Sequence, residues 1–234
     1  FYNYAFNPTF IKTFYSYGDA VKYRGQGASR AAKYGALAVI VRSMTHSTGN
    51  LPHTGAMSYN DSFPRIPALA IGLQDADRLS TRIKTDPSAK VFLRSNSKML
   101  PDVTGHNVIG EITGSEFPDK IITVGGHLDS WDVCEGAHDD GAGCVQSIEI
   151  LRAFKALGIK PRHTIRVVLF ANEENGTRGG KQYAALAKAN KEQHVFALES
   201  DAGGFTPRGF SLTMSPEQRT KVLSWQSLFL PYGV

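Results

Sequence analysis

The chain has 234 residues, 41% of them hydrophobic and 20% charged, which is enough apolar material for the cores of one or two globular domains. Its 26 basic and 21 acidic residues give a formal net charge of +5, and the basic residues are scattered rather than gathered in runs. This composition argues against a nucleic-acid partner and, because no stretch approaches ~18 uninterrupted apolar residues, against a membrane partner.

The first hundred residues are expected to alternate between helices and buried strands. The helix-prone segment QGASRAAKY precedes Gly35, a residue suited to ending a helix, and a continuous apolar run follows. A later stretch rich in Gly, Asn, Pro, Ser and Asp is typical of a long surface loop. In chain order, the expected elements are a helix over 26–34, a strand over 36–41, a loop over 43–64, a strand over 66–71, a helix over 74–83 and a strand over 90–93.

A polar, breaker-rich segment at 95–106 places a domain boundary near residue 100, so we expect domains over 1–99 and 100–234. Strands and helices alternate beyond this boundary, and the alternation predicts an α/β fold with a sheet between layers of helices. The expected strands cover 108–112, 121–124, 165–170 and 195–198, the expected helices cover 144–157 and 181–189, and Ser215-Pro216 begins a further helix.

Chemically active side chains follow the predicted strands at their carboxyl ends, the edge of an open α/β sheet where ligands bind. In chain order they are His127, Asp129, Asp139, Glu173, Glu174 and Asp201. An imidazole together with several carboxylates suits a divalent zinc, manganese or cobalt ion. Because packed carboxylates repel one another, three or more of them are expected to need about two such ions, and paired ions suit hydrolysis.

Two local pairs suggest a division of labour. The adjacent residues Glu173 and Glu174 leave a strand in different directions, so one can bind metal while the other faces the attacking water as a general base. Asp129 lies two residues after His127 on an extended segment, where it is placed to accept the other ring N–H of that histidine.

Each motif taken alone has a plainer interpretation. Asp139-Asp140-Gly141 is most often a turn and a helix N-cap, and a Glu-Glu pair most often lies on a solvated surface. We expect His138 to be a bystander beside Asp139, and Cys134 and Cys144 to be small packing residues. A site is favoured by the joint placement of these motifs at four strand ends.

The four segments together resemble the cocatalytic di-zinc exopeptidases, a family of aminopeptidase and glutamate-carboxypeptidase type. The matching segments are 126–132 (GHLDSWD), 136–143 (GAHDDGAG), 173–174 (EE) and 199–201 (ESD). Segments 25–43, 52–55 and 66–68 of the first half resemble a protease-associated insert found in this family. The resemblance implies a zinc-exopeptidase-type α/β/α sandwich with a mixed sheet, preceded by a partial protease-associated-like domain over 1–99.

The resemblance also implies roles for individual side chains. The implied metal ligands are His127, Asp139, Glu174 and Asp201, and the implied catalytic residues are Glu173 as general base and Asp129 as the support of His127. His127 and Asp201 are expected to bind different zinc ions, with Asp139 bridging the two. The family bends its chain at this bridge, so a strained peptide bond, of which a cis bond is one form, is expected between Asp139 and Asp140.

The function implied by the resemblance is that of a metallo-exopeptidase that hydrolyses small peptides or dipeptides with water activated by two zinc ions. The family draws a further histidine ligand from late in its fold, and no histidine follows His194, so we expect the chain to be a fragment with both domains partial. An extracytoplasmic location and a homodimer are further expectations. The alternative is a catalytically inactive peptidase-like ectodomain that serves as a binding module.

Overall fold

The structure is a computed structural model that describes residues 1–47, 49–132 and 134–234, so Thr48 of the expected 43–64 loop lies outside the described residues. The chain divides into two units. The first contains Phe1–Thr104 together with Glu174–Gly176, and the second contains Gly105–Glu173 together with Thr177–Val234. The protease-associated character expected for 1–99 stays a prediction.

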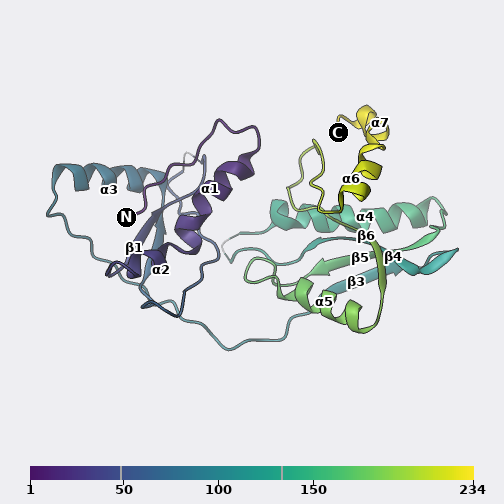
Figure 1. Ribbon diagram of the computed structural model, residues 1–234, viewed down its shortest axis with the longest axis horizontal. Coiled ribbons are helices and arrows are strands. Elements are labelled where there is room, and N and C mark those ends of the chain that lie inside the picture. The colour runs from purple at the N-terminus through teal and green to yellow at the C-terminus, as the bar shows by residue number, and fades with distance from the viewer. Residues whose placement is uncertain (48, 133) are drawn as a thin grey trace. The chain divides into compact units, whose positions relative to one another are not determined.

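The described part of the first unit holds a two-stranded parallel sheet and three helices (Figure 1). Strand β1 (Val39–Arg42) pairs with β2 (Ala68–Ile71), and the helices are α1 (Thr13–Gly25), α2 (Gly27–Ala32) and α3 (Leu73–Thr85). The small core of this unit consists of Ala28, Ala32, Val39, Val41 and Ile66. The helices and strands expected over 26–34, 36–41, 66–71 and 74–83 therefore form near their predicted positions.

The end of α2 shows why Gly35 follows it. Gly35 has a φ angle of +80°, in the left-handed region that glycine adopts without steric cost. Its N–H donates to the carbonyl of Ala32 at 2.9 Å, and the N–H of Ala36 donates to the carbonyl of Ala31 at 3.2 Å. This pair of bonds is a Schellman motif, and it satisfies carbonyl groups that the end of a helix leaves open.

Two expectations for the first unit differ from the structure. The strand expected over 90–93 is wrong: the segment forms no strand, and the side chains of Val91 and Phe92 are exposed, because no neighbouring strand covers them. Helix α1 was not among the expected elements. It buries the small residues Ser16 and Ala20 while Phe14 remains exposed, so hydrophobic periodicity does not mark its inner face.

The second unit is built on a mixed sheet. Its described strands are β3 (Val108–Ile112), β4 (Phe117–His127), β5 (His163–Phe170) and β6 (Gln193–Glu199), arranged in the order β3-β5-β4-β6. Strands β4, β5 and β6 are parallel, and β3 pairs with β5 in the antiparallel sense. The apolar run of β5 is buried, as is typical of a strand covered on both faces.

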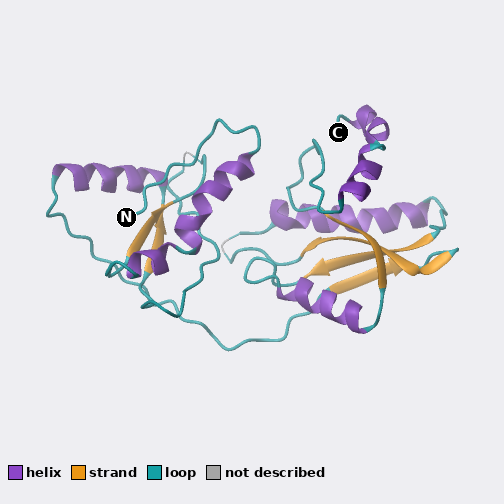
Figure 2. Cartoon of the chain, viewed as in Figure 1, coloured by secondary structure: helices purple, strands orange, loops and turns teal. Residues whose placement is uncertain are grey.

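The crossover connections place helices on opposite faces of this sheet. Helix α4 (Ala142–Ala156) connects β4 to β5, and α5 (Arg178–Ala189) connects β5 to β6, which lies on the other side of β4. Because parallel crossovers are right-handed, a reversal of direction along the sheet moves the connecting helix to the other face. Figures 1 and 2 show α4 and α5 on either side of the sheet. The segments after β4 and β5 therefore leave toward opposite faces, the position at which open α/β sheets bind ligands.

The last part of the chain begins with the helix start expected at Ser215. The Ser215 hydroxyl accepts the N–H of Gln218 at 3.3 Å, and the Gln218 side chain accepts the N–H of Ser215 at 3.0 Å, so α6 (Pro216–Leu223) begins with a capping box. Helix α7 (Gln226–Phe229) and a turn over Leu230–Tyr232 follow. None of the helices in the described part of the chain combines the length and the hydrophobicity needed to cross a bilayer.

Candidate metal centre

The carboxyl ends of three parallel strands meet at one edge of the second unit's sheet. His127, the last residue of β4, pairs with Phe170, the last residue of β5. On the other side of β4, Gly125 pairs with Glu199, the last residue of β6. The segments that follow these strands carry the chemically active side chains, so the register of the sheet brings them to the same edge, as the sequence predicts.

The imidazole of His127 is fixed by the main chain. The ring is buried, and its Nδ1 lies 2.8 Å from the carbonyl oxygen of Asp129. A carbonyl oxygen can only accept, so Nδ1 carries a proton and Nε2 is the ring nitrogen that remains for a metal ion or a second proton. This corrects the expected role of the Asp129 carboxylate, whose Oδ1 lies 3.8 Å from Nδ1 and accepts the main-chain N–H of Glu173 at 2.8 Å.

The other ring nitrogen of His127 faces two carboxylates. Its Nε2 lies 3.1 Å from Oδ1 of Asp139 and 3.5 Å from Oδ1 of Asp201. One donor atom from each of these three residues lies within 4.8 Å of the others. The structure therefore brings together three of the four ligands expected from the sequence, delivered by three separate segments of the second unit.

These separations are compatible with metal binding. Ligand atoms at 2.0–2.2 Å from a tetrahedral ion stand about 3.4 Å apart, close to both distances from Nε2. Nε2 and the carboxylate oxygens attract one another only with a proton or a cation between them, and one imidazole with two carboxylates is a donor set that zinc accepts. The expectation that His127 and Asp201 bind different ions, with Asp139 bridging the two, stays a prediction.

The electrostatics of the cluster also favour a bound cation. Burial opposes a charged His127 ring, but the bond to the Asp129 carbonyl and the nearby carboxylates, Asp201 first among them, outweigh it and raise the pKa of His127. Burial is the main cause that raises the pKa of Asp201 to about 6, and the carboxylates of Asp140 and Asp139 add to it. Without a metal ion, it is therefore energetically unfavourable for all the carboxylates of this cluster to be ionised together.

The turn before α4 presents two adjacent aspartates to different surroundings. The peptide bond between Asp139 and Asp140 is cis, as expected. Asp139 is exposed and reaches Nε2 of His127, whereas Asp140 is buried and accepts main-chain N–H groups of His127 and Gly143. The sequence did not single out Asp140 as part of the site, although the N-cap pattern before α4 was a signal for its bond to Gly143.

The remaining predicted residues have different surroundings. The charge of Glu173 is one of the causes that raise the pKa values of His127 and Glu199, so its carboxylate lies near the cluster. Glu174 belongs to the Glu174–Gly176 segment of the first unit and is outside the group of three, so its role as a ligand stays a prediction. His138 accepts the N–H of Gly204, and its role as a bystander stays a prediction.

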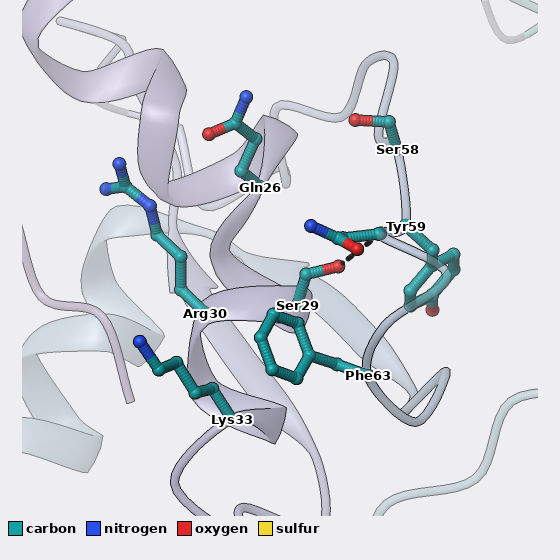
Figure 3. Close-up of a pocket in the computed structure, with 8 residues that line it drawn as sticks. Gln26, Ser29, Arg30, Lys33, Ser58, Tyr59 and Phe63 are labelled. Carbon is teal, nitrogen blue, oxygen red and sulfur yellow. Dashed lines mark hydrogen bonds between the residues drawn. The ribbon is translucent and has the colours of Figure 1, made fainter.

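A cavity of about 420 Å³ lies in the first unit between α2 and the loop at 58–63 (Figure 3). In Figure 3 the charged ends of Arg30 and Lys33 point away from the rings of Tyr59 and Phe63. The described residues that line this cavity include no histidine, cysteine or carboxylate, so it offers none of the usual side-chain ligands of a metal.

Comparison with known proteins places these observations in a family. The model of peptidase family M28 matches residues 107–233. Carboxypeptidase Q of Homo sapiens is 41% identical over 219 residues, which cover 94% of this chain and 46% of that protein. A probable leucine aminopeptidase 2 of Aspergillus oryzae is 28% identical over 167 residues, 71% of this chain and 32% of that protein.

A solved structure agrees with this comparison. The crystal structure of a peptidase M28 precursor from Shewanella amazonensis has a TM-score of 0.79 and 35% sequence identity, and the match covers 94% of this chain and 50% of that one. The match thus covers about half the length of carboxypeptidase Q and of the Shewanella peptidase, and about a third of the leucine aminopeptidase. The mixed sheet of this chain agrees with the fold of the solved structure.

Proposed function

The chain belongs to peptidase family M28, and from this membership we propose that it supplies a large part of the active site of a metal-dependent exopeptidase acting on small peptides or dipeptides. The observation that carries the proposal is the group formed by His127, Asp139 and Asp201 at the carboxyl ends of parallel strands. Two similar proteins support the class of reaction, since one is named a carboxypeptidase and the other a leucine aminopeptidase.

We propose that zinc is the metal and that the complete site holds two ions. His127 would be a ligand of one ion and Asp201 of the other, and the exposed carboxylate of Asp139 would bridge the two. Glu174 would be a further ligand of one of these ions. When bound, such ions polarise the scissile carbonyl group and make water a better nucleophile.

Glu173 is proposed as the general base. Its main-chain N–H donates to the Asp129 carboxylate at 2.8 Å, which fixes where the Glu173 side chain begins. The Glu173 carboxylate takes a proton from the attacking water as the new C–O bond forms. It then passes that proton to the amide nitrogen as the C–N bond breaks, so that a carboxylate and an amine leave. Asp129 thus serves both residues, His127 through its carbonyl and Glu173 through its carboxylate.

The wider expectations remain proposals. A protease-associated-like character for 1–99, an extracytoplasmic location and a homodimer rest on the family resemblance. The alternative of an inactive binding module gains no support from the site, because the imidazole and both carboxylates are present and within ligand distance of one another.

The proposal is tested with the protein that carries this chain, after its metal has been removed with a chelator. Zinc, manganese and cobalt are added back separately, and hydrolysis is followed with three matched peptides that are unblocked, blocked at the amino terminus or blocked at the carboxyl terminus. We expect metal-dependent cleavage of the unblocked peptide and of only one of the blocked peptides. Hydrolysis that persists in chelator, or equal cleavage of all three peptides, contradicts a metallo-exopeptidase.

A further inference from the structure

The main-chain groups of His127 are held on both sides by side chains from the segment that follows. The N–H of His127 donates to Oδ2 of Asp140 at 3.0 Å. The carbonyl oxygen of His127 accepts from the thiol of Cys144 at 3.1 Å. Both of these side chains are buried, with 1% and 7% of their residues' surfaces exposed.

Asp140 also connects the end of β4 to the beginning of α4. Its second oxygen, Oδ1, accepts the N–H of Gly143 at 3.1 Å. A buried carboxylate is costly unless it is hydrogen-bonded, and here each oxygen accepts a main-chain N–H. With both oxygens occupied in this way, the Asp140 carboxylate is positioned to hold main chain rather than to bind an ion.

The glycines around this connection make it possible. A Cβ atom at Gly126 would meet Asp140 Oδ2, and a Cβ atom at Gly143 would meet the carbonyl oxygen of Ser200 as well as the Asp140 carboxylate. The strand end, the start of α4 and the segment after β6 therefore approach one another closely because these positions have no side chain. Cys144 follows Gly143 in the sequence, and this close approach places its thiol beside the carbonyl oxygen of His127.

We propose that Asp140 and Cys144 are positioning residues that set the location of His127 for metal binding, an inference that rests on the proposed function. Ligand atoms must be held within about 0.5 Å of the geometry that an ion requires, and the groups that orient ligands affect affinity by 10–100-fold. The imidazole already has its orientation fixed through Nδ1. Asp140 and Cys144 fix the position of the His127 main chain. Both the main chain and the ring of His127 are therefore held by hydrogen bonds.

The first measurement is zinc affinity, obtained by competition with a chromophoric chelator, together with the visible spectrum of the cobalt-loaded protein. Asp140→Asn keeps the shape of the side chain but replaces one acceptor with a donor, and we expect affinity to fall about 10–100-fold with a shifted cobalt spectrum. Glu199→Gln is the matched control, since it removes a nearby negative charge without touching the His127 main chain. It should weaken zinc binding less and leave the cobalt spectrum in place.

A pair of variants at Cys144 separates hydrogen bonding from packing. Cys144→Ser keeps a donor toward the His127 carbonyl, whereas Cys144→Ala removes it. We expect zinc affinity to be retained better in the serine variant than in the alanine variant. Equal affinities in these two variants, or an equal loss in Asp140→Asn and Glu199→Gln, overturn the proposal.

The second measurement does not depend on metal. In the metal-free protein, the amide hydrogen of His127 should exchange slowly with solvent, and in folded Asp140→Asn it should exchange much faster. Unchanged protection in that variant overturns the positioning role of Asp140. If the wild-type protein binds no zinc, the proposed function fails, while the exchange experiment still decides whether Asp140 holds the main chain of His127.

Discussion

The Nε2 atom of His127 lies 3.5 Å from Oδ1 of Asp201, although one residue ends β4 and the other follows β6. The two strands are neighbours in the sheet, with Gly125 of β4 paired with Glu199 of β6. Because both strands run in the same direction, each ends at the same edge and contributes one side chain to the cluster. The site is therefore a consequence of strand register, and the predictions below depend on that geometry.

Replacement of Asp201 by asparagine should remove one ligand and the negative charge that attracts the ion. We expect zinc affinity to fall by about 100-fold or more, beyond the 10–100-fold typical of residues that merely orient ligands. Competition titration of the purified protein measures this loss. Asp119→Asn is the matched control, because it removes an exposed carboxylate from the opposite end of β4 and should leave zinc affinity unchanged. Similar affinities for both variants contradict the assignment of Asp201.

The adjacent residues Glu173 and Glu174 should differ in what their loss removes. Glu173→Gln is expected to lower the rate of peptide hydrolysis by ~10²–10⁴-fold with little change in metal content, since a general base only moves a proton. Glu174→Gln should lower both the rate and the zinc content. Metal analysis beside rate measurement, in the protein that carries this chain, distinguishes the two. Loss of zinc from Glu173→Gln means that the roles are reversed.

The metal-free protein should lose stability as the pH rises. The pKa of Asp201 is about 6 in the folded protein, against an ordinary value of 3.8, and the pKa of His127 is raised as well. The folded state therefore binds more protons than the unfolded state, and the stabilisation present below about pH 4 is lost as the pH rises through 6.

Thermal melts in chelator at pH 5 and pH 7.5 measure this dependence. The fall in Tm between the two values should be smaller in Asp201→Asn, which has no carboxylate to ionise at that position. Bound zinc should reverse the trend, because a metal ion favours the deprotonated ligands. A metal-free wild-type protein whose Tm rises over this range more than that of the variant runs against the prediction.

Two glycines of the first unit should respond oppositely to alanine. Gly35 has a φ angle of +80°, so Gly35→Ala should destabilise the protein by about 1 kcal/mol. Gly18 lies inside α1 with open space where a Cβ atom would stand, so Gly18→Ala should stabilise it by about 0.5–1 kcal/mol. Urea unfolding of both variants tests the pair, and a change of the same sign in both is inconsistent with these backbone conformations.

Local patterns in the sequence were sufficient for much of the second unit. The apolar run of β5 and the helix start at Ser215-Pro216 each specify an element through short-range chemistry, and both are present in the structure. The placement of acidic and imidazole side chains after strands also predicted one shared edge, because parallel strands align their carboxyl ends. Short-range patterns were insufficient where an element needs a neighbour to form. The apolar segment 90–93 is an example, because it has no strand beside it to pair with.

The tertiary structure alone decided which atoms of the site meet. From the sequence, the Asp129 carboxylate was the expected partner of His127, but the fold places the Asp129 carbonyl there and gives the carboxylate to Glu173. The buried position of Asp140 likewise depends on how closely the end of β4 approaches α4. These choices depend on how segments from different parts of the chain pack against one another. Residue type and spacing determine which groups reach the sheet edge, whereas register and backbone packing determine which of their atoms form bonds.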